Sequence, residues 1–373
     1  MRKSARKKNN TKFKKSSRSK QGYKTGIIVL GFLLGLIFLG KLLSFIDGLS
    51  YPFTPDAPVN TAAKSFFWDG KKPVNVLVKA DSLYLWSFNP DTNRMVLVKI
   101  PDQTQFSLPF DYGFWPVRSI YGLGQTENPS NGALLLTRTI ESAFAVAIDG
   151  YVFTSPVLNF QSEIKQIRQN PLNSLSLFRQ SKTDLTPLEL WKLSWGIKNV
   201  RSDKVELVDL DRTEITSWVL LPDGSRVLKV DQAKLDILLA KSQEDRRLTE
   251  ERLTVGIFNA TVHPQLAEKA ARMVANLGGR VIFIGNTEVK LAETIVTGQI
   301  SYTKDRLSEI FAGFCTRQNS GSKSWPEKIK NIFHQGTDKP GCKGENEVDR
   351  SRADVNIFLG EDYFLRYNRE VSP

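Results

Sequence analysis

The chain has 373 residues, of which 40% are hydrophobic, and carries a formal net charge of +13. That hydrophobic content excludes a wholly disordered chain, and the length suits two folded units. With only two histidines and two cysteines, a zinc cluster with four such ligands would use all of them, so we set that class of site aside.

The positive charge is concentrated at the N-terminus. Residues 1–25 contain eleven Lys or Arg residues and no acid, which leaves 41 basic against 39 acidic residues in the rest of the chain. A nucleic-acid-binding domain normally carries its basic residues on a folded face, so we expect no nucleic-acid partner. The tail is interpreted as a cytoplasmic topology signal that rests on anionic lipid.

An apolar run follows the tail at once. Residues 26–46 hold a single charge, Lys41, and as a helix they would be about 31 Å long, which matches a hydrocarbon core of about 30 Å. We therefore predict one transmembrane helix, with residues 1–25 cytoplasmic and the remainder extracytoplasmic at the cell membrane. A cleaved signal peptide is the alternative, but no small-x-small cleavage site follows promptly.

A proline-bearing stalk, residues 47–73, is expected to lead into the first folded part. Apolar runs without alternation at 74–78 and 82–88 predict strands that are covered on both faces. The turn Asn89-Pro90-Asp91 predicts a hairpin between 82–88 and a third strand at 95–100.

Further elements follow in this first part. We expect Gly122-Leu123-Gly124 to form a turn, because it lacks the third glycine of a dinucleotide loop. The other elements expected are a helix at 132–144, a strand at 151–153, a strand at 204–210 and a helix at 231–240.

A capping box marks one more helix. Thr186 at the N-cap and Glu189 three residues later predict its start, and Gly196 its end. Trp191 and Trp195 fall on one side of this helix. We interpret the tryptophans, these two included, as core residues rather than a carbohydrate platform, and suspect only Trp115 of ligand contact.

The remaining sequence predicts a smaller α/β unit. Seven of the eleven residues 242–252 are charged, which indicates an interdomain linker or a helix extension. Beyond it, strands are expected at 253–261, 280–287 and 353–363. A helix after Pro264 should end at Gly278-Gly279, and another should bury Leu307, Ile310, Phe311 and Phe314.

Two cysteines lie in this last part, Cys315 and Cys342. An extracytoplasmic location permits a disulfide between them, which would stabilise the fold by roughly 3 kcal/mol in the chain-entropy model. Two unpaired thiols are equally compatible with the sequence.

Several motifs together resemble one family. An anchor, an apolar strand pair, Ile100-Pro101, Tyr121-x-x-Gly124, a helix and Asp149-Gly150-Tyr151 occur in this order. This order resembles the LytR-CpsA-Psr family of membrane-anchored envelope proteins. Three segments of the last part, at 255–261, 280–287 and 353–363, resemble the domain often attached at that family's C-terminus.

The resemblance implies an α/β fold. It consists of a transmembrane helix, an α/β/α-layered LytR-CpsA-Psr-like domain and a smaller C-terminal α/β domain. The expected boundaries are a basic tail at 1–25, the transmembrane helix at 26–46, a stalk at 47–73, the LytR-CpsA-Psr-like domain at 74–241, a linker at 242–252, the C-terminal domain at 253–365 and a tail at 366–373.

The resemblance also implies an activity, the transfer of glycopolymers from a polyprenyl pyrophosphate carrier to peptidoglycan. That step requires several cations around the pyrophosphate and carboxylates that hold a divalent metal. Lys79-Ala80-Asp81-Ser82 replaces the family's Arg-Ser-Asp-Thr, so Asp81 is the candidate metal ligand and Lys79 replaces a bidentate arginine.

The remaining arginine positions are also depleted. Ile100-Pro101-Asp102-Gln103 replaces Ile-Pro-Arg-Asp, so an acid occupies a cation's place. The arginine-rich stretch after Tyr151 is reduced to the surroundings of Arg168. Lys79, Arg118 and Arg168 are therefore the candidate pyrophosphate-binding residues, and no catalytic residue is assigned.

These departures favour a pseudoenzyme. We predict a non-catalytic binding or scaffolding module in cell-wall glycopolymer attachment or envelope maintenance. Its partners would be the bilayer through residues 26–46 and a cell-wall polymer, a lipid-linked precursor or another envelope protein. No cofactor is expected. The alternative is an active transferase that uses Mg²⁺ and a rearranged set of basic residues.

Overall fold

The computed structural model describes residues 28–38, 40–41, 68–127, 131–154, 160–171, 181–312 and 352–368. The chain divides into two compact units, Met1–Tyr51 and Pro52–Pro373. The expected disulfide between Cys315 and Cys342 lies outside the described residues, as do the basic tail and most of the stalk.

In the N-terminal unit, residues 28–38 and 40–41 are helical, and their apolar side chains are exposed. Within the described ranges, no helix is both long enough and apolar enough to cross a membrane. The edges of the predicted span 26–46 lie outside those ranges, so the transmembrane helix stays a prediction.

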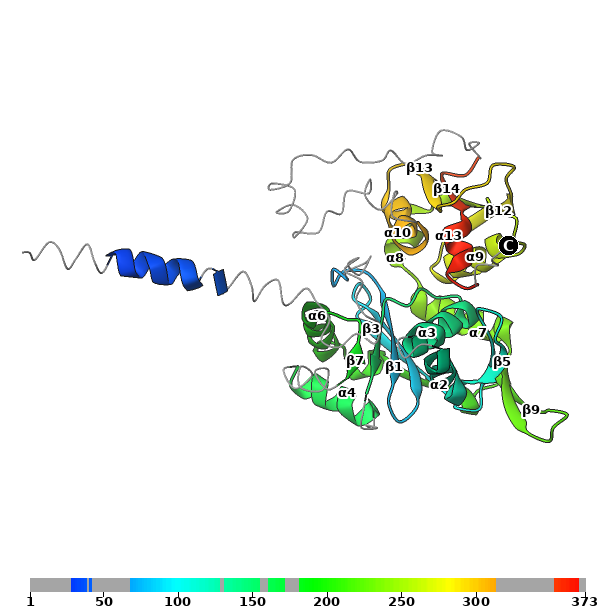
Figure 1. Cartoon of the computed structure of the whole chain (residues 1–373), viewed down its shortest axis with the longest axis horizontal. Coiled ribbons are helices and arrows are strands. Elements are labelled where there is room, and N and C mark those ends of the chain that lie inside the picture. Colours follow the sequence, from blue (N-terminus) through cyan, green and yellow to red (C-terminus); the bar gives the residue numbers. More distant parts are fainter. Residues whose placement is uncertain are drawn as a thin grey trace, which may run out of the picture. The chain divides into compact units, whose positions relative to one another are not determined.

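A six-stranded sheet organises the first part of the larger unit (Figure 1). Its strand order is β7-β6-β1-β2-β3-β8, in which β1–β2–β3 is an antiparallel meander, and β6 and β8 run parallel to β1 and β3. The hairpin predicted at Asn89-Pro90-Asp91 is confirmed. The strands are β1 (Val74–Lys79), β2 (Leu83–Asn89), β3 (Arg94–Ile100), β6 (Gly150–Phe153), β7 (Lys182–Thr183) and β8 (Val205–Asp209).

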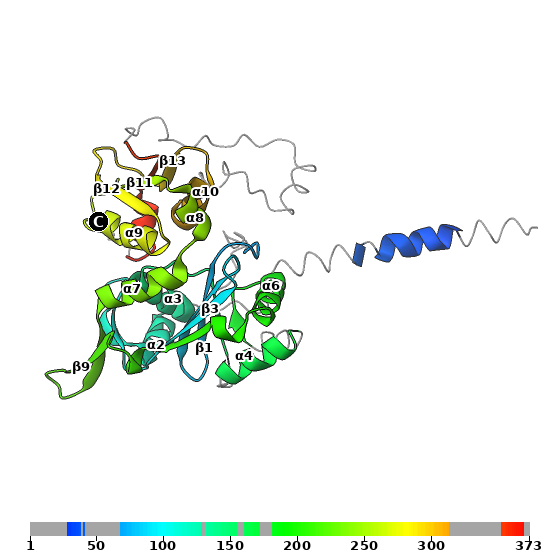
Figure 2. The ribbon, with the colours of Figure 1, turned by 180° about the vertical axis from the view of Figure 1, so that it is seen from behind.

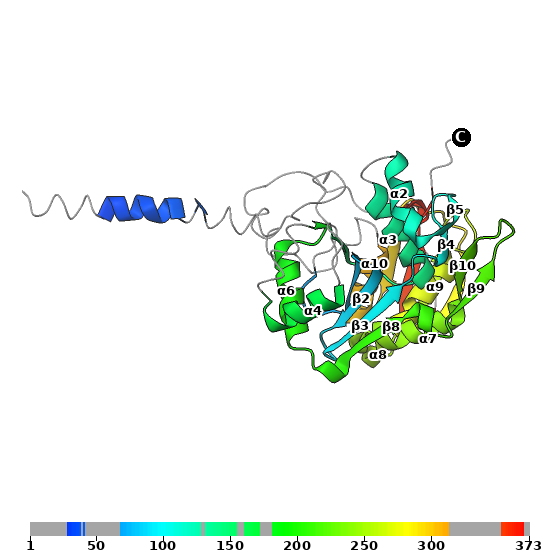
Figure 3. The same cartoon turned by 90° about the horizontal axis from the view of Figure 1, so that it is seen from below.

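Helices cover both faces of this sheet, as the unbroken apolar strands predict (Figure 3). Alternate residues of β2 point to opposite cores: Leu85 packs with one set of helices and Trp86 with the other. The first set is α2 (Val117–Glu127), α3 (Asn131–Phe144) and α7 (Gln232–Gln243), and the second is α4 (Phe160–Gln169) and α6 (Pro187–Lys198). The α/β/α layering is therefore confirmed.

The turn expected at Gly122-Leu123-Gly124 is wrong, because these residues lie inside α2. Gly124 is needed for packing rather than for a turn. A Cβ atom there would come within 2.7 Å of the Asn131 carbonyl oxygen, where α3 begins. The glycine therefore permits close approach of the two helices.

The end predicted for α6 is also wrong. The capping box between Thr186 and Glu189 is present in full, but the helix continues through Gly196 to Lys198. A Cβ at position 196 would lie 2.7 Å from Cε1 of Phe88, which is buried in β2. Gly196 therefore marks a tight helix–sheet contact and not a helix end.

The prediction that the tryptophans are core residues is correct for only part of the set. Trp68 and Trp86 are buried. Trp191, Trp195, Trp218 and Trp115 are 43%, 48%, 53% and 38% exposed. An apolar run on a helix that covers a sheet includes outward positions, and sequence alone did not separate these from the inward ones.

Some elements had no clear sequence signal. They are the short hairpins β4 (Gln105–Leu108) with β5 (Gly113–Pro116) and β9 (Thr216–Leu220) with β10 (Arg226–Val230), strand β13 (Ile295–Gly298), and the 3₁₀ turns Ser202–Lys204 and Leu210–Arg212.

A four-stranded sheet forms the second part of this unit, in the order β12-β11-β14-β13 (Figure 2). Strands β12 and β14 are parallel to β11, and β13 is antiparallel to β14. The remaining bounds are β11 (Thr254–Asn259), β12 (Arg280–Asn286), β14 (Val355–Leu359), α8 (Arg246–Glu251), α9 (Leu266–Asn276), α10 (Tyr302–Phe311) and α13 (Glu361–Leu365). Phe314, expected on the helix that is α10, lies outside the described residues.

Buried polar contacts join the two sheets. Arg306 of α10 is 2% exposed and donates through Nη2 to the carbonyl oxygen of Pro73, directly before β1, at 3.2 Å. Its Nε atom lies 3.6 Å from a carboxylate oxygen of the fully buried Asp245, between α7 and α8. Lys72 also forms an ion pair with Glu309. Asp245 is thus buried within the charged segment expected to be a linker or a helix extension, and α8 occupies Arg246–Glu251 of that segment.

Candidate functional site

Lys79 ends β1 at the edge where the parallel neighbour β6 also ends. Its carbonyl oxygen accepts hydrogen bonds from the backbone N–H and the hydroxyl of Thr154, at 2.9 and 3.3 Å. The ammonium group lies 4.3 Å from the centroid of the Tyr121 ring on α2, within cation–π range. Pairing within the sheet thus fixes the backbone of Lys79, and contact with the Tyr121 ring positions its ammonium group.

A second lysine meets the same tyrosine. Lys182 of β7 donates from Nζ to the Tyr121 hydroxyl at 3.3 Å, and Gln125, one turn later on α2, donates to it at 3.3 Å. Arg118 lies one turn before Tyr121 on the same helix and is exposed. Among the described ion pairs, none involves Arg118. We call Lys79, Tyr121, Lys182 and Arg118 the basic cluster.

The electrostatics of this cluster are mixed. Burial lowers the pKa of Lys79, and the charge of Asp102 partly opposes that shift. Asp102, the acid that takes a cation's place in the altered Ile-Pro motif, therefore also acts on the lysine. The backbone N–H of Arg118 also donates to the Asp102 carbonyl, at 3.2 Å. An anion here would gain two or three cations and meet one carboxylate.

Asp81, the candidate metal ligand, is engaged in the fold. Its Oδ1 accepts the backbone N–H of Phe160, at the start of α4, at 3.2 Å, and its Oδ2 accepts the hydroxyl of Tyr84 at 3.1 Å. Burial and the adjacent carboxylate raise the pKa of Tyr84. Both partners pack on the α4 face of the sheet, whereas Lys79 contacts Tyr121 on the α2 face.

A divalent metal does not fit this arrangement. In the described part of the chain, no group of three or more His, Cys, Asp or Glu side chains is placed to hold a metal ion. Asp81 already uses both oxygen atoms for hydrogen bonds within the fold. We therefore derive no chemical step through Mg²⁺.

Arg168 does not join the basic cluster. It lies in the last turn of α4, eight residues after Phe160, which corresponds to about 12 Å along the helix. Its Nη2 donates to the carbonyl oxygen of Val200 at 2.7 Å and to the hydroxyl of Ser202 at 3.2 Å. Of the four expected site residues, Lys79 contacts Tyr121 and Arg118 lies one helical turn from that tyrosine, whereas Asp81 and Arg168 have structural contacts.

Sequence reasoning missed two members of the cluster. Tyr121 was noted only as part of Tyr-x-x-Gly. No local sequence signal indicates that it contacts both Lys79 and Lys182. Lys182 stands in a two-residue strand without a recognisable motif. Its position depends on β7 pairing with β6, which is a long-range contact.

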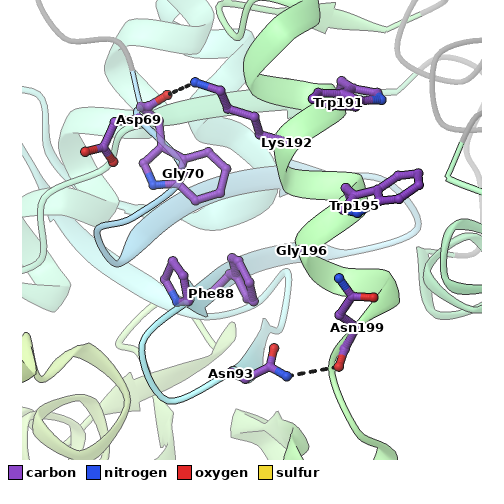
Figure 4. A pocket seen from close by; sticks show the side chains of 11 residues that line it. Asp69, Gly70, Phe88, Asn93, Trp191, Lys192, Trp195, Gly196 and Asn199 are labelled. Carbon is purple, nitrogen blue, oxygen red and sulfur yellow. Dashed lines mark hydrogen bonds between the residues drawn. The ribbon is translucent and has the colours of Figure 1, made fainter.

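A separate cavity of about 530 Å³ lies at the other end of the β1–β2 pair. Its lining includes Phe88, which pairs with Val74 at the start of β1, five residues from Lys79 and thus about 17 Å away along the strand. Lys192 of α6 crosses the cavity and donates to the Trp68 carbonyl at 3.3 Å. Figure 4 shows the rings of Trp191 and Trp195 on the other side of α6 from Phe88.

No protein-family model matches the chain. A curated relative, the polyisoprenyl-teichoic acid–peptidoglycan teichoic acid transferase TagU of Oceanobacillus iheyensis, is 24% identical over 166 residues. This match spans 41% of the chain and about half, 51%, of the relative.

Two solved structures are also similar. Bacillus subtilis TagT is 17% identical, with 52% of this chain and 98% of that chain covered and a TM-score of 0.35. Bacillus subtilis TagV is 14% identical, with 46% and 96% covered and a TM-score of 0.36. Superpositions at these TM-scores do not by themselves establish a common fold.

Proposed function

From the resemblance to LytR-CpsA-Psr proteins, which the curated relative confirms, we propose that this chain is an envelope protein that acts in cell-wall glycopolymer attachment. Its basic cluster binds the phosphate of a lipid-linked precursor or a phosphorylated wall polymer, and it does so without transferring the polymer. The resemblance of residues 253–365 to a LytR-type C-terminal domain remains part of this proposal.

The observation that carries the proposal is the convergence of Lys79 and Lys182 on Tyr121. The two ammonium groups belong to β1 and β7, which flank β6, and both lysines pair with Phe153 at the same edge of the sheet. They form a localised positive site, with Arg118 one turn from Tyr121 on α2. Charge-assisted hydrogen bonds to phosphate oxygens are stronger than neutral ones, so such a site favours a phosphate. Lysines bind phosphate as point charges and lack the bidentate geometry of arginine.

The same residues favour binding over catalysis. A phosphoryl-group transfer needs developing negative charge to be neutralised in the transition state. Here the negative charge of Asp102 already partly offsets the positive charge of Lys79. The carboxylate of Asp81 accepts hydrogen bonds from the Phe160 backbone at the start of α4 and from Tyr84, rather than being kept for a metal. The alternative, an active transferase, rests on the similarity to TagU, which is a teichoic acid transferase.

The proposed location is the outer face of the cell membrane, with residues 26–46 as a single-pass anchor and residues 1–25 in the cytoplasm. The apolar length of the segment and the eleven basic residues before it support this orientation. Protease treatment of intact cells tests it, because externally added protease should remove the larger unit and spare the basic tail.

Binding of polyprenyl pyrophosphate to the full-length chain in detergent tests the cluster. Each of Lys79→Ala and Lys182→Ala should weaken binding about tenfold or more, since a hydrogen bond to a charged group contributes about 1.5–3 kcal/mol. Asp102→Asn should strengthen it roughly fivefold, the equivalent of removing about 1 kcal/mol of repulsion.

The matched control is Arg168→Gln, which removes a cation at the far end of α4 and should leave binding unchanged. Equal effects of Lys79→Ala and Arg168→Gln, or no effect of either lysine substitution, would show that the phosphate binds elsewhere.

A further inference from the structure

The outer face of α6 is apolar and basic. Leu188, Trp191 and Trp195 recur at helical spacing and are 41%, 43% and 48% exposed. Lys198, at the end of the same face, places its Nζ 5.1 Å from the centroid of the Trp195 ring. We call these four residues the α6 stripe.

No carboxylate of α6 faces solvent. The acid of this helix, Glu189, is 3% exposed and accepts hydrogen bonds from the backbone N–H groups of Trp68 and Thr186, both at 2.8 Å. The stripe therefore combines indole rings, a leucine and a lysine and contains no acid itself, while Asp69 lines the adjacent cavity. Tryptophan is enriched at membrane–water interfaces, where lysine side chains also extend to the headgroups.

The described part of the larger unit begins beside this helix. Trp68, the first described residue after the N-terminal unit, is buried and is held by Glu189 and by Lys192 of α6. Only 21 residues, 47–67, separate it from the proposed anchor. In any conformation 21 residues span at most about 75 Å, so the proposed anchor tethers Trp68 and the neighbouring α6 within that reach of the membrane.

We propose that the α6 stripe rests on the surface of the lipid bilayer, with the rings of Trp191 and Trp195 at the headgroup level. This inference rests on the anchor proposed above. It places the start of β1 nearer to the bilayer than the end of β1, where the basic cluster lies about 17 Å further along the strand.

A saccharide is the competing occupant, because aromatic rings also stack on sugars. Sugar recognition requires hydrogen-bonding side chains beside the rings to fix orientation. Beside the rings, the stripe presents an aliphatic leucine and a lysine that lies over Trp195 itself. The adjacent cavity also holds Asp69 and Asn93, but Asp69 accepts the backbone N–H groups of Lys71 and Lys72, and Asn93 donates to the Asn199 carbonyl oxygen. The short segment between the proposed anchor and Trp68, which contacts α6, is an argument for a bilayer and gives no reason to expect a saccharide. The observations therefore favour the bilayer.

Fluorescence quenching by brominated lipids tests this contact on the full-length chain in bilayer nanodiscs. All seven tryptophans lie at or after Trp68, and the proposed anchor has none, so any quenching by lipid reports on the larger unit. We expect quenching in the unmodified chain, strongest for bromines near the headgroups. The double variant Trp191→Ser/Trp195→Ser should lose most of it.

The matched control is Trp115→Ser/Trp218→Ser, which removes two exposed tryptophans from β5 and β9 and should keep the quenching. Absence of quenching in the unmodified chain, or equal losses in the two double variants, overturns the docking. A change in the emission of Trp191 and Trp195 with soluble wall saccharides, without quenching by lipid, overturns it in favour of a sugar site.

Failure of the anchor is recognised separately. A chain that does not float with bilayers refutes the anchor, and the docking with it. A chain that floats but shows no quenching by brominated lipid refutes the docking alone.

Discussion

Replacement of Arg306 by methionine tests the buried junction between the two sheets. The guanidinium group is 2% exposed and contacts the carboxylates of Asp245 and Glu309 at 3.6 and 3.5 Å, in addition to the Pro73 carbonyl. Burial alone would lower the pKa of Arg306, but the acids around it, Asp149 first, raise it overall. The arginine is therefore charged in the folded protein, and its positive charge compensates the negative charge of the surrounding carboxylates.

The expected cost follows from what the substitution leaves behind. Asp245 is fully buried, and without Arg306 its carboxylate keeps only neutral donors, the Tyr302 hydroxyl at 2.6 Å and the Arg247 backbone N–H at 3.2 Å. Removing one partner of a buried ion pair costs about 3–5 kcal/mol. The double variant Arg306→Met/Asp245→Asn should be less destabilised than the sum of the single variants, since position 245 then no longer holds a buried carboxylate without its cation.

Urea unfolding of the full-length chain measures this loss in the free energy of unfolding. The control is Arg246→Met on α8, whose ion pair with Glu250 is 65% and 60% exposed and should contribute at most about 1 kcal/mol. Circular dichroism and tryptophan fluorescence should shift together in Arg306→Met, because the residue ties α10 to the start of β1. A loss no greater than that of Arg246→Met would refute the buried junction.

Three further predictions concern local packing and charge. Gly196→Ala should destabilise the fold by about 1–3 kcal/mol, because its Cβ would overlap the buried ring of Phe88; a neutral effect in urea unfolding would contradict the α6–β2 packing. Thr186→Ala should cost about 0.5–2 kcal/mol through loss of the capping box, again by urea unfolding. Because burial lowers the pKa of Lys79 below 10.5, the unfolded chain holds that proton more tightly. The free energy of unfolding should therefore gain a contribution that rises with pH between the lowered pKa and 10.5, and Lys79→Met should remove it; equal pH slopes in the two proteins would contradict the burial.

The central strands β1, β2 and β3 were predictable because they are apolar runs bounded by turn residues. Asn89-Pro90-Asp91 and the capping box at Thr186 are local signals, and both were read correctly. The errors at Gly124 and Gly196 have a common cause. A glycine required by a neighbouring helix or strand has the same sequence appearance as one required by a turn.

The candidate site was predictable only in part for a related reason. Lys79 and Arg118 were identified from their motifs, but Lys182 reaches the same tyrosine through pairing between β6 and β7, which are 28 residues apart in the chain. The side chain of Arg168 could not be placed from sequence, because its partners Val200 and Ser202 belong to a distant segment. Exposure of Trp191 likewise depends on which side of α6 meets the sheet.

Binding and turnover, measured together, test the central claim most directly. The full-length chain would be given a glycopolymer linked to polyprenyl pyrophosphate, peptidoglycan as the acceptor and Mg²⁺. We predict saturable binding that depends on Lys79 and Lys182, with no polymer transferred to the acceptor. Transfer by the unmodified chain that is abolished by Asp81→Ala, in a variant that still folds, would contradict this account and identify an active transferase.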